Sequence, residues 1–150
     1  MVHASNIPGA GLGLFLLEPV KKGERIAVYS GEVLNRTQIV NNDSKYLLRI
    51  SKNVFLDARD RQHCDGRYIN CGRNTRMNIN ARFSASRTYN YDSASNTNWV
   101  SIFSTRDIEA SETAAVEILV DYGDEYWNSF DLSTLKQKSV ISICNIMYTL

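Results

Sequence analysis

The sequence predicts a mostly β fold that is built from many short strands. Short runs rich in apolar, β-branched and aromatic residues recur along the chain, and glycine, asparagine and lysine-containing turns separate them. No segment shows the roughly 10–15 residues of helical spacing that a βαβ unit requires. At 150 residues the chain is long enough to bury one core, so we expect a single domain.

The first expected strands follow a glycine-rich loop. Residues 6–13 hold small or conformationally permissive residues, which are typical of a loop, and residues 14–17 then read as a buried strand. A second strand is expected over residues 25–33. It is interrupted at Gly31, where a bulge or a close approach of another backbone would explain the glycine.

The later strands are shorter and lie between polar segments. Residues 57–77 are rich in Arg, Asn, Asp and Gly and are expected to form a loop, and residues 85–98 a surface excursion. The strands themselves are expected at 46–50 and 54–56, which form a hairpin, at 80–84 and 99–103, which form a pair, and at 117–120.

Composition excludes several classes of partner and site. The 17 basic residues are balanced by 16 acidic ones, so direct nucleic-acid binding is not expected. No run approaches the roughly 18 apolar residues of a membrane span, so no membrane partner is expected either. Cys64, Cys71 and Cys144 form no CxxC pair, which favours a reducing, intracellular compartment. Together with His3 and His63 they lack zinc spacing, and we expect no metal.

Six short segments carry the functional signal. Each is weak alone: the glycine pair at Gly11 and Gly13, for example, more often marks a tight turn than a ligand site. In their order, however, the segments resemble the SET domain family of protein-lysine methyltransferases, over about residues 4–127. The segments are 9–15 (GAGLGLF), 29–32 (YSGE), 55–58 (FLDA), 66–70 (GRYIN), 80–83 (NARF) and 120–123 (VDYG).

The resemblance implies a fold of several short-stranded sheets with a C-terminal pseudoknot, and S-adenosylmethionine as co-substrate. Asn70 would contact the methionine end of that molecule, the main chain of Cys71 would meet the adenine, and Trp127 would cover the adenine ring. The cofactor-binding residues implied are Gly11, Leu12, Gly13, Tyr46, Asn70, Cys71, Tyr122 and Trp127.

The resemblance also implies a narrow channel for a lysine side chain. Tyr29, Tyr46, Val120 and Tyr122 would line it, and Tyr122, with Tyr29 and Tyr46, would carry catalysis. Aromatic walls suit a long alkyl ammonium group. The small Val120 would leave room for more than one methyl group. The expected substrate is a protein, in the first place a histone tail, and the expected location is the nucleus, as for a chromatin regulator.

Three departures from the family pattern leave other interpretations open. Cys71 and Gly72 replace the usual His-Ser, eight residues separate Cys71 from Asn80, and residues 107–117 are longer than the usual turn. A SET-like module that only docks peptides or proteins is therefore one alternative, and methylation of a non-histone protein is another.

The end of the chain is assigned separately. We expect residues 1–127 to form the methyltransferase domain and residues 128–150 to form a tail or a short helix. Val140, Ile143 and Met147 could line one face of such a helix and cover the channel, because only Cys144 remains of the cysteine-rich segment that closes it in some relatives.

Overall fold

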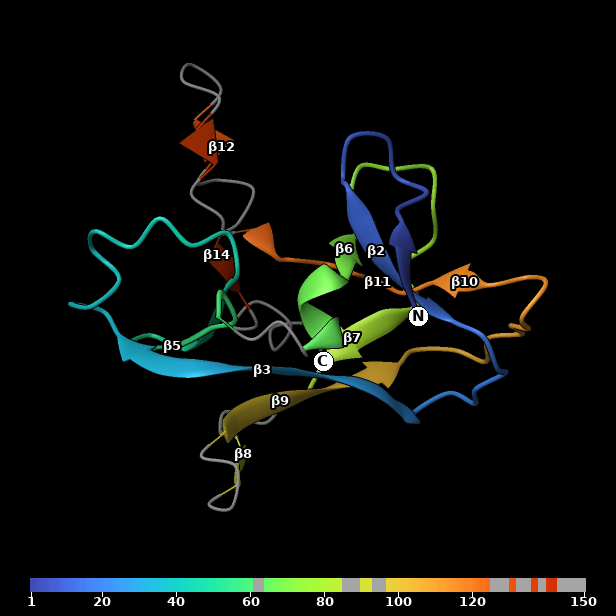
Figure 1. The fold of residues 1–150 in the computed structure, drawn as a ribbon, viewed down its shortest axis with the longest axis horizontal. Coiled ribbons are helices and arrows are strands. Elements are labelled where there is room, and N and C mark those ends of the chain that lie inside the picture. The colour runs from blue at the N-terminus through green and yellow to red at the C-terminus, as the bar shows by residue number, and fades with distance from the viewer. Residues whose placement is uncertain are drawn as a thin grey trace. The chain divides into compact units, whose positions relative to one another are not determined.

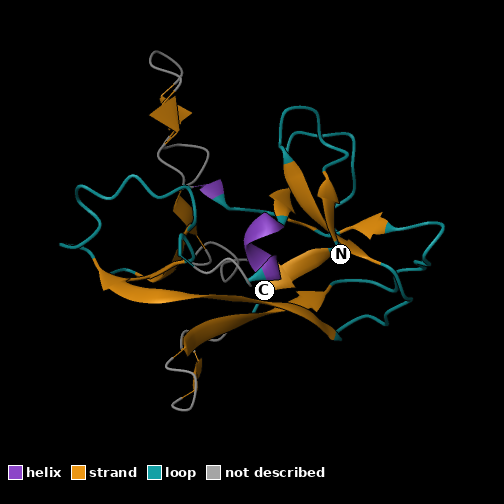
Figure 2. Cartoon of the chain, in the orientation of Figure 1, coloured by secondary structure: helices purple, strands orange, loops and turns teal. Residues whose placement is uncertain are grey.

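The computed structural model describes residues 1–60, 64–84, 90–92, 97–124, 130–131, 136–137 and 140–142. Figure 2 shows strands and loops with very little helix in this part of the chain, which confirms the mostly β fold. The chain forms two compact units. The first comprises Met1–Tyr29, Asp65–Ser84 and Ser101–Asp121, and the second comprises Ser30–Cys64, Ala85–Val100 and Tyr122–Leu150.

Strands β3 and β9 contribute residues to both units. No helix in the described ranges is long and apolar enough to cross a membrane. The elements, most of them labelled in Figure 1, are β1 (Val2–Ala4), β2 (Leu12–Leu16), β3 (Arg25–Asn35), β4 (Leu47–Ser51), β5 (Val54–Asp57), the 3-10 helix η1 (Asp65–Tyr68), β6 (Asn70–Cys71), β7 (Ala81–Phe83), β8 (Asn90–Asp92), β9 (Thr97–Ser104), β10 (Val116–Glu117), β11 (Leu119–Val120), β12 (Phe130–Asp131), β13 (Lys136–Gln137) and β14 (Val140–Ser142).

The first unit is organised around β2, which follows the glycine-rich loop. Strand β1 pairs antiparallel with one edge of β2, and β10 pairs antiparallel with the other edge. Leu14 and Phe15 of β2 are buried, at 5% and 7% exposed, so this strand contributes directly to the core. The buried strand expected at residues 14–17 is therefore present, but it begins two residues earlier and ends one residue earlier than predicted.

The segment expected as one strand at residues 117–120 changes partner at Ile118. Glu117 in β10 lies opposite Phe15, whereas Leu119 in β11 pairs in parallel with Asn70 in β6. Ile118 joins the two by donating its backbone N–H to the carbonyl of Leu14 at 2.8 Å. Residues 116–120 thus pair first with β2, the strand after the glycine-rich loop, and then with β6, which contains Asn70.

Strand β7 completes the first unit by pairing antiparallel with the end of β9, with Ala81 opposite Ser104 and Phe83 opposite Ile102. This is the pair expected from residues 80–84 and 99–103. Phe83 and Ile102 are almost fully buried. The ring of Tyr29 packs edge-on against that of Phe83, with centroids 6.2 Å apart.

The second unit contains the strand order β14-β4-β5-β3. Strands β4 and β5 form the hairpin expected from residues 46–50 and 54–56. Strand β3 runs unbroken from Arg25 to Asn35, so the interruption predicted at Gly31 is wrong. The alternative explanation of the glycine holds, because a Cβ at Gly31 would overlap the main-chain carbonyl of Asp57.

The tail contains strand where a helix was considered. Val140–Ser142 form β14 and pair in parallel with β4, Val140 lying opposite Leu47. The helical interpretation is therefore wrong at Val140, because edge pairing with the hairpin supplies the backbone hydrogen bonds that a helix would otherwise provide. Ile143 and Met147 lie outside the described residues.

Candidate active site

A buried carboxylate, Glu117, organises the candidate cofactor region in the first unit. Glu117 is 2% exposed and accepts hydrogen bonds from the Ser5 hydroxyl at 2.6 Å, the Asn6 backbone N–H at 2.8 Å and the Asn70 side chain at 3.1 Å. Three donors compensate for the desolvation of this charged group. Glu117 therefore ties the end of β1 and the start of β6 to β10.

The glycine loop is shaped by this carboxylate. Gly11 adopts a φ of 76°, a conformation that favours glycine, and its carbonyl accepts from the Ser5 N–H at 2.8 Å. Gly13 has a different requirement, since a Cβ there would overlap the Glu117 side chain. Between them, Leu12 is half exposed. The absence of side chains at Gly11 and Gly13 is thus explained within the fold.

Asn70 joins the glycine loop to β6. Its side-chain Nδ2 donates to the Leu12 carbonyl at 2.9 Å and to Glu117 Oε1 at 3.1 Å. Both partners are acceptors, so the NH2 end of the amide must face them, and this fixes the orientation of the side chain. The two sequence segments assigned to cofactor binding are therefore in direct contact, and the Asn70 Oδ1 has no hydrogen-bond donor among the described residues.

Cys71 and Gly72 are held by β11. Cys71 pairs with Val120, and Gly72 donates its N–H to the Val120 carbonyl at 2.9 Å. A Cβ at Gly72 would lie 3.3 Å from the Cβ of Leu119. A glycine therefore allows the close approach of the two backbones, whereas a larger residue would push β11 away. The parallel pairing of β6 with β11 therefore places Asn70 and Cys71 beside the strand that ends at Val120.

The four residues assigned to the lysine channel fall in both units. Tyr29 and Val120 belong to the first unit and are each 1% exposed. Tyr46 and Tyr122 belong to the second unit and are half buried. Trp127, assigned to the adenine ring, lies outside the described residues.

Tyr46 is positioned by a network that the sequence did not predict. Its backbone N–H donates to the Ser44 hydroxyl oxygen at 3.1 Å, and its carbonyl accepts from the Ala58 N–H at 3.0 Å. The Ser44 hydroxyl donates in turn to the buried Asp57 carboxylate at 2.6 Å. The backbone on both sides of Tyr46 is therefore fixed within the second unit.

Potential metal ligands do not gather in the described chain. No group of three or more His, Cys, Asp or Glu side chains in the described ranges is arranged to hold a metal ion. Cys64 is buried, and its sulfur accepts a hydrogen bond from the Ser30 N–H at 3.1 Å.

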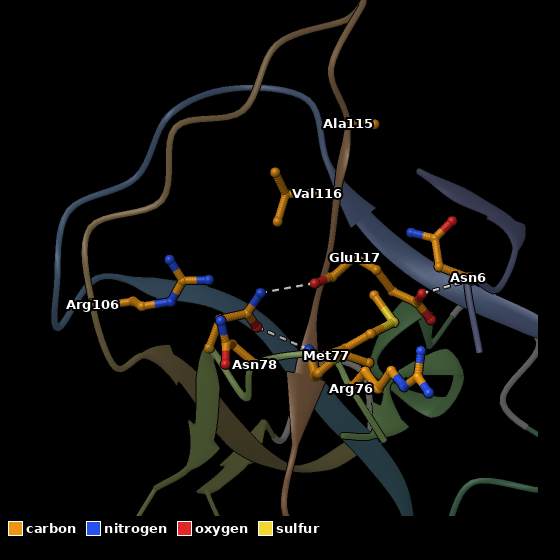
Figure 3. A pocket seen from close by; sticks show the side chains of 10 residues that line it. Asn6, Arg76, Met77, Asn78, Arg106, Ala115, Val116 and Glu117 are labelled. Atoms are coloured by element: carbon orange, nitrogen blue, oxygen red, sulfur yellow. Dashed lines mark hydrogen bonds between the residues drawn. The ribbon is translucent and has the colours of Figure 1, made fainter. Parts of the chain in front are cut away.

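The first unit also contains an open pocket of about 300 Å³. Figure 3 shows it between Arg106 on one side and Arg76 and Asn6 on the other, with Asn78 and Glu117 between them. Of the residues assigned to the cofactor or the lysine channel, none lines this pocket.

A SET domain family model matches residues 11–123. The chain belongs to the SET domain family. The match begins at Gly11 of the glycine loop and ends at Gly123, so it covers most of the described chain. No curated protein matches the sequence.

Solved structures share the fold of this SET domain at low sequence identity. One is an active polycomb repressive complex 2 in the stimulated state, with a TM-score of 0.61 and 20% identity over 93% of this chain and 17% of that chain. Another is ctPRC2 in complex with H3K27me3 and H3K27M, with a TM-score of 0.61 and 19% identity over 94% of this chain and 16% of that chain. The SET domain thus spans less than a fifth of the length of these two chains.

A third structure is similar in size to this SET domain. It is a Plasmodium falciparum protein named as a histone methyltransferase, with a TM-score of 0.55 and 23% identity over 85% of this chain and 95% of that chain. At these identities the likeness concerns the fold.

Sequence reasoning missed Glu117, Ser44 and Asp57 as organising residues. A signal for Glu117 was present, since a carboxylate within the apolar run at 116–120 is expensive to bury without partners. No such signal marks Ser44, because a serine next to a turn is ordinary.

Proposed function

We propose that this chain is a protein-lysine N-methyltransferase that transfers a methyl group from S-adenosylmethionine to a lysine side chain, with a histone tail as the substrate class. The single observation that carries the proposal is the 2.9 Å hydrogen bond from Asn70 to the Leu12 carbonyl. It brings together the two segments that the SET family uses for its co-substrate. The named activity of the Plasmodium falciparum protein and the histone ligands of ctPRC2 favour a histone substrate.

The donor and acceptor pattern around Asn70 fits the methionine end of the co-substrate. With both Nδ2 hydrogens engaged by Leu12 and Glu117, the Asn70 Oδ1 is left as an acceptor for the ammonium group of an amino acid. Main-chain groups of Gly11, Leu12 and Gly13 would contact the same end, and main-chain groups of Cys71 the adenine. Tyr46, Tyr122 and Trp127 would complete the site. S-adenosylmethionine supplies an electrophilic methyl group on a sulfonium.

Tyr29, Tyr46, Val120 and Tyr122 would receive the lysine. A lysine amine has a pKa of about 10.4 in water and must lose its proton before it can act as a nucleophile. Enclosure among aromatic rings and the nearby sulfonium charge both lower that pKa, and the proton leaves to water. The Tyr122 hydroxyl would orient the neutral amine, whose nitrogen bonds to the methyl carbon as the carbon–sulfur bond breaks.

Two other functions stay in competition with the proposed one. A docking module without turnover is motivated by Cys71 and Gly72, which replace the family's His-Ser. Methylation of a non-histone protein differs from the proposed function only in its substrate.

A nuclear location follows from the histone proposal and fails with it. Residues 1–127 would form the catalytic domain, and residues 128–150 would cover the channel.

The decisive experiment replaces Tyr122 with phenylalanine. Tyr122→Phe removes one hydroxyl and preserves the ring, so methyl transfer from labelled S-adenosylmethionine to core histones should fall by about 10² or more. Tyr68→Phe, another half-buried phenol, is the matched control and should stay active. A non-histone extract tests the third function in parallel.

Each outcome distinguishes the competing functions. Equal activity of wild type and Tyr122→Phe would remove Tyr122 from catalysis. Absence of transfer to any protein, with S-adenosylmethionine still bound, would favour the docking module.

A further inference from the structure

The pocket in the first unit lies where the chain departs from the family pattern. The enlarged segment at residues 72–79 contributes one wall, the enlarged segment at residues 107–117 contributes another, and Arg106 lies just before the second segment. The lining comprises Asn6, Arg76, Met77, Asn78, Asn80, Arg106, Ala115, Val116, Glu117 and Leu119. Both unusual segments therefore build the same cavity.

The two arginines of this pocket carry unneutralised charge. Arg76 and Arg106 are exposed, and neither makes an ion pair or a hydrogen bond within the described residues. Two other described arginines differ, since Arg59 lies 2.8 Å from an Asp43 oxygen and Arg73 lies 3.8 Å from an Asp121 oxygen. Arg76 and Arg106 are thus available for a ligand.

The acidic groups closest to these arginines in the chain or the pocket are already engaged. Asp107, which follows Arg106, accepts from the Lys22 N–H at 2.8 Å and from Lys21 Nζ at 3.3 Å. Glu117 lines the pocket, but three donors occupy its carboxylate and it is 2% exposed. Two arginines therefore line the pocket beside one compensated carboxylate, which leaves an excess of positive charge among the lining residues.

The floor of the pocket is fixed before any ligand arrives. The buried side chain of Asn80 donates from Nδ2 to the Glu117 carbonyl at 2.8 Å and accepts from the Leu119 N–H at 2.9 Å. The Asn80 carbonyl accepts from the Thr105 N–H at 2.9 Å. Asn80 thus locks β10, β11 and the residue before Arg106 together, and a preorganised floor lowers the entropic cost of binding.

We propose that this pocket binds a small anion that carries two carboxylate or phosphate groups, one for each arginine. Guanidinium groups bind both kinds of anion through paired N–H donors. Figure 3 shows Arg106 and Arg76 on different sides of the pocket with the amide of Asn78 between them, so two separated anionic groups match the site better than one. The pocket includes none of the residues proposed to contact the co-substrate or the lysine, although Glu117 both lines it and accepts from Asn70.

The test is calorimetric titration of the whole chain with pyrophosphate and, separately, with succinate. Saturable one-to-one binding of either is expected, with affinity that falls as salt is raised. Which of the two binds more tightly identifies the chemical class. Arg76→Gln and Arg106→Gln should each weaken binding about tenfold. Arg36→Gln, at another exposed arginine that lies in the second unit, should leave binding unchanged.

Several results would overturn the proposal. Absence of saturable heat with both anions would exclude the site, and equal losses in all three variants would indicate non-specific charge attraction. Thermal melting of each variant checks that it is folded. Two further variants, Arg76→Lys and Arg106→Lys, keep the positive charge but lose the guanidinium group. If these two lysine variants bind as weakly as the glutamine variants while melting normally, paired guanidinium geometry is required.

Discussion

The Ser44 hydroxyl donates a 2.6 Å hydrogen bond to the Asp57 carboxylate, and both residues are buried. Asp57 also accepts from Asn42 Nδ2 at 3.0 Å and from the Arg59 N–H at 2.9 Å. The Ser44 oxygen also accepts a hydrogen bond from the Tyr46 N–H. Ser44 therefore links the Asp57 carboxylate to the backbone of Tyr46. The buried carboxylate of Asp57 therefore fixes the turn at residues 42–46 by hydrogen bonds.

Removing the Ser44 hydroxyl should destabilise the second unit. Ser44→Ala deletes one bond to a charged acceptor and one from a backbone donor, so we expect a loss of about 1–3 kcal/mol in the free energy of unfolding, measured in urea. Ser111→Ala, at an exposed hydroxyl, is the control and should change stability by less than about 0.5 kcal/mol. Similar losses in the two variants would show that the buried network contributes little.

Glu117 should be required for stability as a carboxylate. Glu117→Gln replaces one carboxylate oxygen by an NH2 group. Because Oε1 accepts from two donors and Oε2 from one, at least one donor loses its acceptor, and about 2 kcal/mol or more of stability should be lost. Glu112→Gln changes the same charge at an exposed site and serves as the control. Urea unfolding curves compare the two, and an unchanged midpoint for Glu117→Gln would contradict the assigned role.

The glycine loop offers a comparison between two physical causes. Gly13→Ala brings a methyl group into the Glu117 side chain, and overpacking of this kind commonly costs about 1–3 kcal/mol. Gly11→Ala meets open space but forces alanine to a φ of 76°, which costs about 1 kcal/mol. Double mutants with Glu117→Ala distinguish the two causes. Removing the Glu117 side chain should abolish the stability loss caused by Gly13→Ala and leave the loss caused by Gly11→Ala unchanged.

Asp107 should titrate below an ordinary aspartate. The N–H of Lys22 donates to its carboxylate, Lys21 adds a second hydrogen bond, and both lower the pKa of Asp107. A lowered folded-state pKa means that the ionised form contributes stability above the unfolded-state pKa, and that this contribution is lost as the pH falls through the folded-state value. The effect should be small because the group is exposed. Carbon-detected NMR titration of Asp107 measures it, and a midpoint at or above the ordinary value would contradict it.

Local patterns predicted most strands, because each depends on a few consecutive residues. The hairpin of β4 and β5 and the pair of β7 and β9 follow from short runs of β-favouring residues that polar segments separate. The partner change at Ile118 and the Glu117 network could not be predicted in this way. Ser5 and Glu117 are separated by 112 positions, and only the folded chain shows that they meet. Gly13 was predicted to bind the co-substrate, whereas the folded chain shows that the Glu117 side chain leaves no room for a Cβ at this position.

The role of Asn70 separates structure from co-substrate binding, and this last prediction depends on the proposed function. Asn70→Ala removes the Nδ2 donor to Leu12 and Glu117, and it also removes the Oδ1 acceptor that is proposed for the ammonium of S-adenosylmethionine. Glu117→Gln disturbs the same bond network but preserves that acceptor. Both variants should therefore lose stability, whereas only Asn70→Ala should lose the co-substrate.

Calorimetric titration with S-adenosylmethionine, performed well below the melting temperatures of both variants, makes the comparison. We expect Asn70→Ala to bind at least about tenfold more weakly than wild type, as befits a lost hydrogen bond to a charged group. Glu117→Gln should bind within a few-fold of wild type. If the folded forms of both variants lose affinity equally, Asn70 acts only as a structural link between β6 and the glycine loop. If neither loses affinity, the co-substrate does not contact Asn70.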